Sequence, residues 1–64
     1  MTPDRKAILA HLQIVPLYLA WGDRIEFCRG EFALLRFDLD DASTLVAAGT
    51  LDDCLRAAGE RGAL

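Results

Sequence analysis

The stretch that decides the fold is RIEFCRGEFALLRFDL, residues 24–39, which contains all three phenylalanines of the chain. In its first half, Ile25 and Phe27 alternate with less apolar residues, and a period of two is typical of a half-buried β-strand. The second half, residues 31–39, alternates in the same way towards its end. Gly30 lies between the halves and can adopt the positive φ that a two-residue turn requires. The stretch therefore predicts an antiparallel β-hairpin.

The length of the hairpin loop decides which side chains share a face of the sheet. A two-residue loop at Arg29 and Gly30 pairs Phe27 with Phe32, whereas a three-residue loop would slip the second strand and exchange its faces. We favour the two-residue loop, which leaves both faces partly apolar. We therefore expect helix to cover one face, while the other can meet a partner or a second copy. One face would hold Ile25, Phe27, Phe32 and Leu34, and the other Ala33, Leu35 and Phe37.

A helix and a further strand are predicted before the hairpin. Thr2 can cap a helix and Pro3 suits its first position, and Pro16 prevents its continuation, so we place this helix at residues 3–13. Residues 17–21 can form a strand or a short helix, and the Gly-Asp turn after them favours the strand. The prediction is a three-stranded antiparallel meander of residues 17–21, 24–28 and 31–38.

Two short helices are predicted after the hairpin. Asp40 can cap the first, and Gly49 would end it. Thr50 can cap the second, with Asp53 at the third position, where a capping box has its acid, and Gly59 would end it. Residues 1–64 are therefore predicted to form a single α+β domain, with an N-terminal helix, a three-stranded meander and one or two short C-terminal helices.

Length, composition and charge exclude several classes of function. A chain of 64 residues buries only about 60% of its unfolded surface. Its 53% of hydrophobic residues favour a compact domain or an oligomer over a disordered chain. The net charge of −3 argues against direct binding of nucleic acid, which usually needs a basic face. No apolar run approaches the roughly 20 residues of a membrane span, so we expect no membrane partner.

The cysteines and the N-terminus indicate the compartment. Cys28 and Cys54 lack the spacing of a metal site, and the charged N-terminus lacks a signal-like apolar run. We expect free thiols in a reducing cytoplasm, with a disulfide between these two residues as the less favoured alternative. The excess of arginine over lysine and the abundance of alanine are associated with GC-rich bacterial or phage genomes, so we expect a bacterial host cell.

The sequence shows no catalytic centre, and we expect neither enzymatic activity nor a cofactor. His11 is the only histidine, and neither a nucleophile nor an orienting partner lies near it in the sequence. Activity lost on mutating His11 or Cys28 would revive the idea of a minimal enzyme. The acids at 38–41 lack the glycine and the other oxygen ligands of a calcium loop, so we also expect no metal.

Five aspartates between residues 38 and 53, with no basic residue among them, form the candidate partner-binding site. They can simply cap helices and keep the chain soluble. Alternatively, they can form one negative face that imitates a phosphate backbone and occupies a groove lined by lysine and arginine. Trp21 stands beside a Gly-Asp turn, where it can anchor an interface or pack in the core. The candidate residues are Asp38, Asp40, Asp41, Asp52, Asp53 and Trp21.

In its size, acidity, α+β character and lack of a catalytic motif, the chain resembles the small anti-CRISPR proteins of phages. It looks like those that block a type I surveillance complex by occupying a DNA-binding surface, and the five aspartates carry this resemblance. The resemblance implies a non-enzymatic inhibitor whose partner is a basic surface of a CRISPR effector subunit. The alternative is a small homo-oligomeric regulatory or accessory module, similar to an antitoxin, that binds through the apolar sheet face. The chain would be a monomer or a homodimer.

Overall fold

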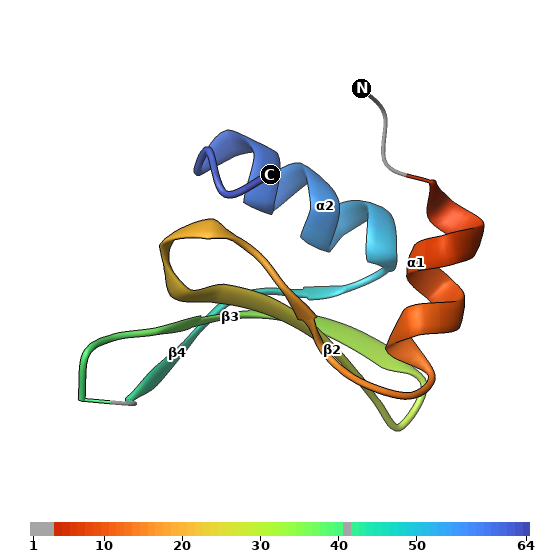
Figure 1. The fold of residues 1–64 in the computed structure, drawn as a ribbon, viewed down its shortest axis with the longest axis horizontal. Helices are drawn as coiled ribbons and strands as arrows, with labels where there is room; N and C mark the ends of the chain where they lie inside the picture. The colour runs from red at the N-terminus through yellow and green to blue at the C-terminus, as the bar shows by residue number, and fades with distance from the viewer. Residues whose placement is uncertain (1–3, 41) are drawn as a thin grey trace.

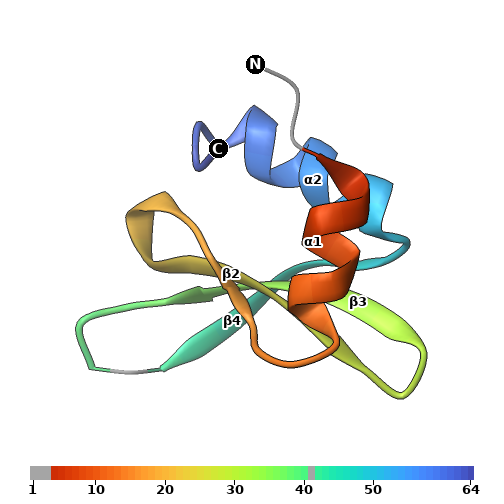
Figure 2. The same cartoon turned by 45° about the vertical axis from the view of Figure 1, so that its right-hand side comes forward.

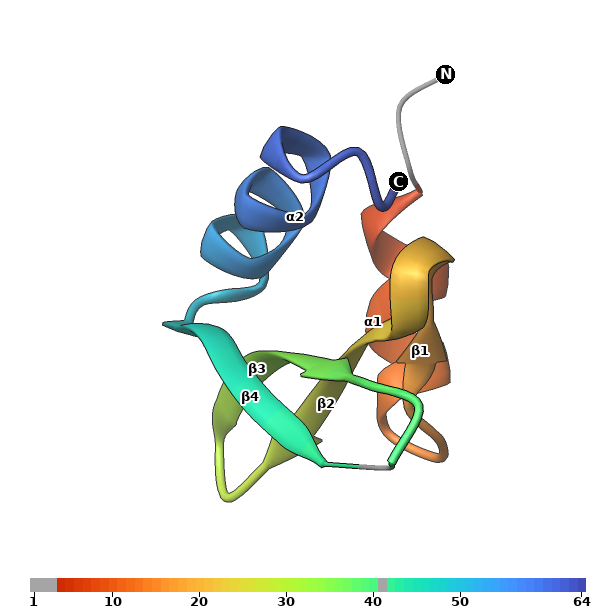
Figure 3. The same cartoon turned by 90° about the vertical axis from the view of Figure 1, so that its left-hand side faces the viewer.

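The computed structural model describes residues 4–40 and 42–64 and has two helices on one face of a four-stranded antiparallel sheet (Figure 1). The α+β class is therefore confirmed. Views from two further directions show both helices on the same side of the sheet (Figures 2 and 3). The strands lie in chain order, β1-β2-β3-β4. The elements are α1 (Arg5–Leu12), β1 (Leu17–Tyr18), the 3-10 turn η1 (Ala20–Gly22), β2 (Asp23–Cys28), β3 (Glu31–Phe37), β4 (Ser43–Gly49) and α2 (Leu51–Glu60).

The β2–β3 hairpin has the predicted two-residue loop and register. Phe27 pairs with Phe32, and their ring centroids are 4.7 Å apart. The two loop residues, Arg29 and Gly30, both have positive φ, at 56° and 80°. Positive φ at both positions is the pattern of a type I′ turn, whose twist matches that of the flanking strands. The observed turn is therefore the one that the sequence of residues 24–39 predicts.

The core lies between the sheet and the helices. Ile25 and Leu34 pair across β2 and β3, and both are fully buried. Both helices cover them, because Leu12 of α1 belongs to the same buried cluster as these two residues, together with side chains of α2. The core is small, as expected for a chain of this length. Its buried apolar residues are Leu12, Ile25, Leu34, Leu51, Cys54, Ala58 and Ala63.

The predicted helix after the hairpin is wrong, because residues 43–49 form the fourth strand, β4. This strand pairs with β3 along its length, and Val46 is the extra residue of a β-bulge opposite β3. Asp40 caps no helix. Instead, the Asp38 carboxylate accepts hydrogen bonds from the backbone N–H groups of Asp40, at 2.9 Å, and Ala42, at 3.0 Å. Such side-chain bonds stabilise a turn, and here the turn returns the chain alongside β3.

The first helix is shorter than predicted. It begins at Arg5, and the Asp4 side chain caps it by accepting hydrogen bonds from the backbone N–H groups of Lys6 and Ala7. The predicted cap, Thr2, and the predicted first residue, Pro3, lie outside the described residues. The helix ends at Leu12, one residue before the predicted end. Neither of the two described helices has the length and apolar character needed to cross a lipid bilayer.

The predicted strand at residues 17–21 is only partly correct, because β1 has two residues and the chain then enters η1. Trp21 and Gly22 both have positive φ, at 63° and 77°, which is incompatible with a continuous strand. A Cβ atom on residue 22 would lie 2.4 Å from the backbone oxygen of Phe37, so only glycine fits there. The close approach of β3 therefore forces the turn at this point.

The second predicted cap is confirmed at α2. The Thr50 hydroxyl accepts a hydrogen bond from the Asp53 N–H at 3.1 Å, and the Asp53 carboxylate accepts one from the Thr50 N–H at 3.3 Å. The helix continues through Gly59, which does not end it. It ends at Glu60, and Gly62, whose φ is 74°, follows the cap residue Arg61 in a Schellman motif in which the Ala63 N–H donates to the Ala58 carbonyl at 2.9 Å.

Residues 61–63, which we call the C-terminal clip, bind the segment that precedes and begins β2. The Arg61 guanidinium donates two hydrogen bonds to the Asp23 carboxylate, at 2.6 Å and 2.9 Å. Asp23 is only 1% exposed, so its charge depends on this bidentate partner. The other bonds run from the Ala20 N–H to the Ala63 carbonyl at 3.1 Å and from the Trp21 Nε1–H to the Gly62 carbonyl at 3.0 Å.

Candidate binding surfaces

The predicted acids do not form one surface. Asp38 and Asp40 belong to the turn between β3 and β4, whereas Asp52 and Asp53 lie in the first turn of α2. The whole of β4 separates the two groups, and seven residues of strand span roughly 20 Å (Figure 1). Asp41 lies outside the described residues. A single acidic face built from these residues is therefore not present in the described part of the chain.

Several of these acids have structural partners. Asp52 lies 3.1 Å from the guanidinium of Arg5, and Asp53 lies 3.0 Å from that of Arg56. Hydrogen bonds from the Thr50 hydroxyl and backbone, with a smaller contribution from Arg56, hold the pKa of Asp53 below its usual value. The carboxylates of α2 therefore serve the helix start, which agrees with the capping interpretation.

Neither of the two described helices covers the opposite face of the sheet (Figure 3). We call it the open face. Tyr18 of β1 and Leu45 of β4 lie at its two margins and are 69% and 60% exposed. Between them, β3 contributes Leu35, which pairs with Leu45, and the half-buried Ala33 and Phe37. The hairpin register predicted this set of β3 residues on one face.

Arg24 lies across the open face. Its guanidinium carbon is 3.9 Å from the ring centroid of Phe37 and 5.9 Å from that of Tyr18, which is the geometry of a cation–π contact. Its Nε atom lies 2.6 Å from Oε2 of Glu26, and both atoms are out of contact with solvent although no aligned hydrogen bond joins them. The open face therefore carries the ion pair of Arg24 and Glu26 among aromatic and aliphatic side chains, and Glu31 lies on the same face at the hairpin end of β3.

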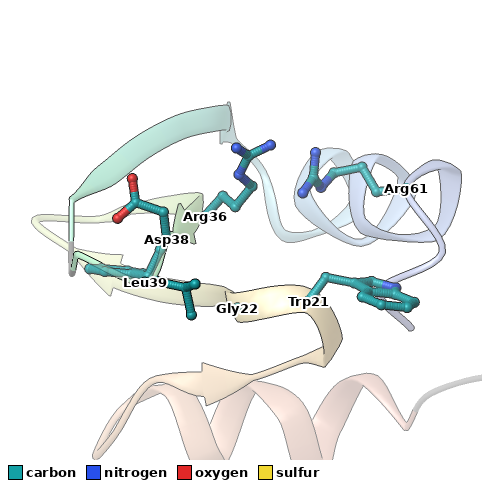
Figure 4. A pocket seen from close by; sticks show the side chains of 7 residues that line it. Trp21, Gly22, Arg36, Asp38, Leu39 and Arg61 are labelled. Carbon is teal, nitrogen blue, oxygen red and sulfur yellow. The ribbon is translucent and has the colours of Figure 1, made fainter.

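Trp21 is exposed, as an interface residue would be, with 73% of its surface accessible. It lines a groove of about 620 Å³, which we call the Trp21 groove (Figure 4). Of the predicted acids that the structure describes, Asp38 lines the groove, and Asp40, Asp52 and Asp53 do not. The arginines of this groove, Arg36 and Arg61, could not be predicted from the sequence because they lie far apart in the chain. The residues labelled in Figure 4 are Trp21, Gly22, Arg36, Asp38, Leu39 and Arg61.

His11 and the cysteines have structural surroundings. Nε2 of His11 lies 2.9 Å from the Pro16 carbonyl, which ties the end of α1 to the following loop. No group of three metal-ligating side chains occurs among the residues that the structure describes. Both cysteines are free, with Cys28 exposed and Cys54 buried. Burial raises the pKa of the Cys54 thiol, and the Asp53 charge adds to this effect.

The two thiols should differ strongly in reactivity. In the folded chain, an aromatic disulfide reagent should modify Cys28 within minutes, because this residue is exposed, and should leave Cys54 unmodified. Cys54 should react only when the chain unfolds, because its side chain is in the core and the thiolate is disfavoured there. Mass spectrometry of the labelled protein measures both sites. Equal labelling of the two cysteines in buffer would contradict this placement of α2.

Comparisons with protein-family models, with curated proteins and with solved structures find no match to this chain.

Proposed function

We propose that this chain is a small, non-enzymatic binding module that associates with a second copy of itself through the open face. The observation that carries the proposal is the row of apolar side chains that no helix covers, from Tyr18 to Leu45. Contiguous apolar patches on small proteins commonly mark interaction sites. Covering this face would also enlarge a core that has only seven buried apolar residues in the described part of the chain.

The charges of the open face favour a second copy over a strongly charged partner. Arg24 and Glu26 already pair with each other at 2.6 Å, so neither of them requires an oppositely charged partner. The outer strand β4 contains no charged residue and no proline, which are the residues that usually protect a sheet edge. A second copy can therefore approach Leu45 without meeting a charge on this strand.

Leu45→Lys should convert a dimer into a monomer. Leu45 is 60% exposed in the single chain, so lysine should leave the fold intact, within about 0.5 kcal/mol. At the interface, however, the new ammonium group would lose its water without gaining a partner. Sedimentation equilibrium at micromolar concentration should give twice the mass of the chain for the wild type and the mass of one chain for the variant.

Leu64→Lys is the matched control, because Leu64 is 57% exposed and belongs to the segment after α2, on the helix side of the sheet. This variant should remain a dimer. A wild-type chain that is strictly monomeric at micromolar concentration would overturn the proposal and leave the open face to a different protein. A dimer that survives Leu45→Lys would overturn it as well.

The resemblance to anti-CRISPR proteins stays a prediction. An acidic decoy needs carboxylates that are close together and free to meet a basic groove. In the structure, β4 separates the two acid groups, and Asp52 and Asp53 already pair with arginines. The open face therefore supports the homo-oligomeric alternative better than the acids support the inhibitor.

A further inference from the structure

The Trp21 groove combines an aromatic ring, a fully exposed leucine and two guanidinium groups in an otherwise acidic chain. Figure 4 shows Arg36, from β3, and Arg61, from the end of α2, pointing toward each other across the groove. Trp21 lies at one end of the groove, and Leu39, which is fully exposed, lies at the other (Figure 4). The volume of about 620 Å³ is within the usual range for small-molecule sites, roughly 300–1,000 Å³.

The indole of Trp21 is both exposed and fixed. Its Nε1–H donates to the Gly62 carbonyl at 3.0 Å, and its backbone is held at a φ of 63°. Positive φ is unfavourable for a bulky residue, and such strain persists only where the surroundings impose it. A fixed aromatic ring with an accessible face loses little conformational entropy when a planar group stacks on it.

The two arginines have N–H donors for which the described chain provides no acceptor. A guanidinium has five N–H donors, and Asp23 accepts from two of those on Arg61. This ion pair fixes the position of Arg61 and leaves three donors for the groove. Arg36 makes no ion pair with any residue in the ranges 4–40 and 42–64. Asp38 also lines the groove, but its Oδ1 atom is engaged by the backbone of its own turn.

We propose that the Trp21 groove binds a small phosphorylated molecule with a planar ring, of the class of the nucleoside monophosphates. Two guanidinium groups from different elements suit a phosphate, because its three terminal oxygens can accept hydrogen bonds from both groups at once. In a carboxylate, by contrast, a single guanidinium engages both oxygens. The ring would stack on the indole of Trp21, a contact that does not depend on the identity of the base. Longer nucleic acids would be repelled by the net charge of −3.

Trp21 itself reports binding, because it is the only tryptophan of the chain. Titration with adenosine monophosphate should quench its fluorescence along a saturable curve. Adenosine, which lacks the phosphate, and inorganic phosphate, which lacks the ring, should each bind at least about tenfold more weakly, since each loses one of the two contacts. Raising the salt concentration should weaken the binding of the nucleotide and of inorganic phosphate but not the binding of the nucleoside.

Arg36→Gln should lower the affinity for adenosine monophosphate about tenfold or more and leave the affinity for adenosine unchanged. Arg29→Gln is the matched control, because it removes the same charge at the far end of β2, in the hairpin turn, and should leave both unchanged. Circular dichroism checks that both variants fold. The proposal is overturned if adenosine monophosphate gives no saturable response at millimolar concentration, if adenosine or inorganic phosphate binds as tightly as the nucleotide, or if the two arginine variants behave alike.

Discussion

Arg61→Met should lower the free energy of unfolding by about 3 kcal/mol, because it leaves the Asp23 carboxylate buried and unpaired. Asp23 is 1% exposed, and Arg61 donates both of the hydrogen bonds that the structure shows to its carboxylate. A domain of 64 residues has a total stability of roughly 3–10 kcal/mol, so this loss would remove about a third of the stability or more. Urea denaturation followed by circular dichroism measures the shift.

Two further variants distinguish the effect of leaving a buried charge unpaired from the effect of simply removing an arginine. Arg56→Met removes an exposed arginine that pairs only with Asp53 on the helix surface, and it should cost no more than about 0.5 kcal/mol. Adding Asp23→Asn to Arg61→Met should recover part of the loss, because the uncompensated charge is then gone. Identical denaturation midpoints for Arg61→Met and Arg56→Met would show that the ion pair between Arg61 and Asp23 contributes nothing to stability.

Leu34→Ala should lower the free energy of unfolding by about 2–5 kcal/mol. Leu34 is fully buried at the centre of the sheet, where it pairs with Ile25 on one side and Ala47 on the other. Truncation removes apolar contacts and leaves a cavity that a small core has few side chains to fill. Thermal denaturation by calorimetry should show a much lower melting temperature and a smaller enthalpy.

The control for this effect is Leu39→Ala. It makes the same chemical change at a residue that is fully exposed in the turn after β3, and it should move the melting temperature by no more than a few degrees. A cost of less than about 1 kcal/mol for Leu34→Ala would mean that the helices do not cover the sheet as described.

Much of the fold follows from local signals in the sequence. The hairpin register depends on Gly30 and on alternation within residues 24–39, and the start of α2 depends on Thr50 and Asp53. Both signals act over a few residues, so a single sequence suffices to identify them. By contrast, the ion pair of Asp23 with Arg61 joins residues 38 positions apart, and no spacing rule connects them.

The error at β4 explains the error in the candidate site. The run at residues 43–49 is short and apolar, and such a run fits either a helix or a strand. The run forms a strand because it pairs with the free edge of β3, and this pairing is a tertiary interaction that the local sequence does not reveal. A helix of seven residues is only about 10 Å long, which would have kept Asp40 near Asp52. The strand is about twice as long and moves the two acid groups apart.

The C-terminal clip also bears on how the chain acquires its shape during synthesis. The ribosome releases β1, η1 and β2 before residues 61–63, which hold the partners of Ala20, Trp21 and Asp23. Until residues 61–63 have left the exit tunnel, the Asp23 carboxylate lacks its Arg61 partner. The corner of the sheet around Asp23 can therefore reach its final form only after Ala63 has been released.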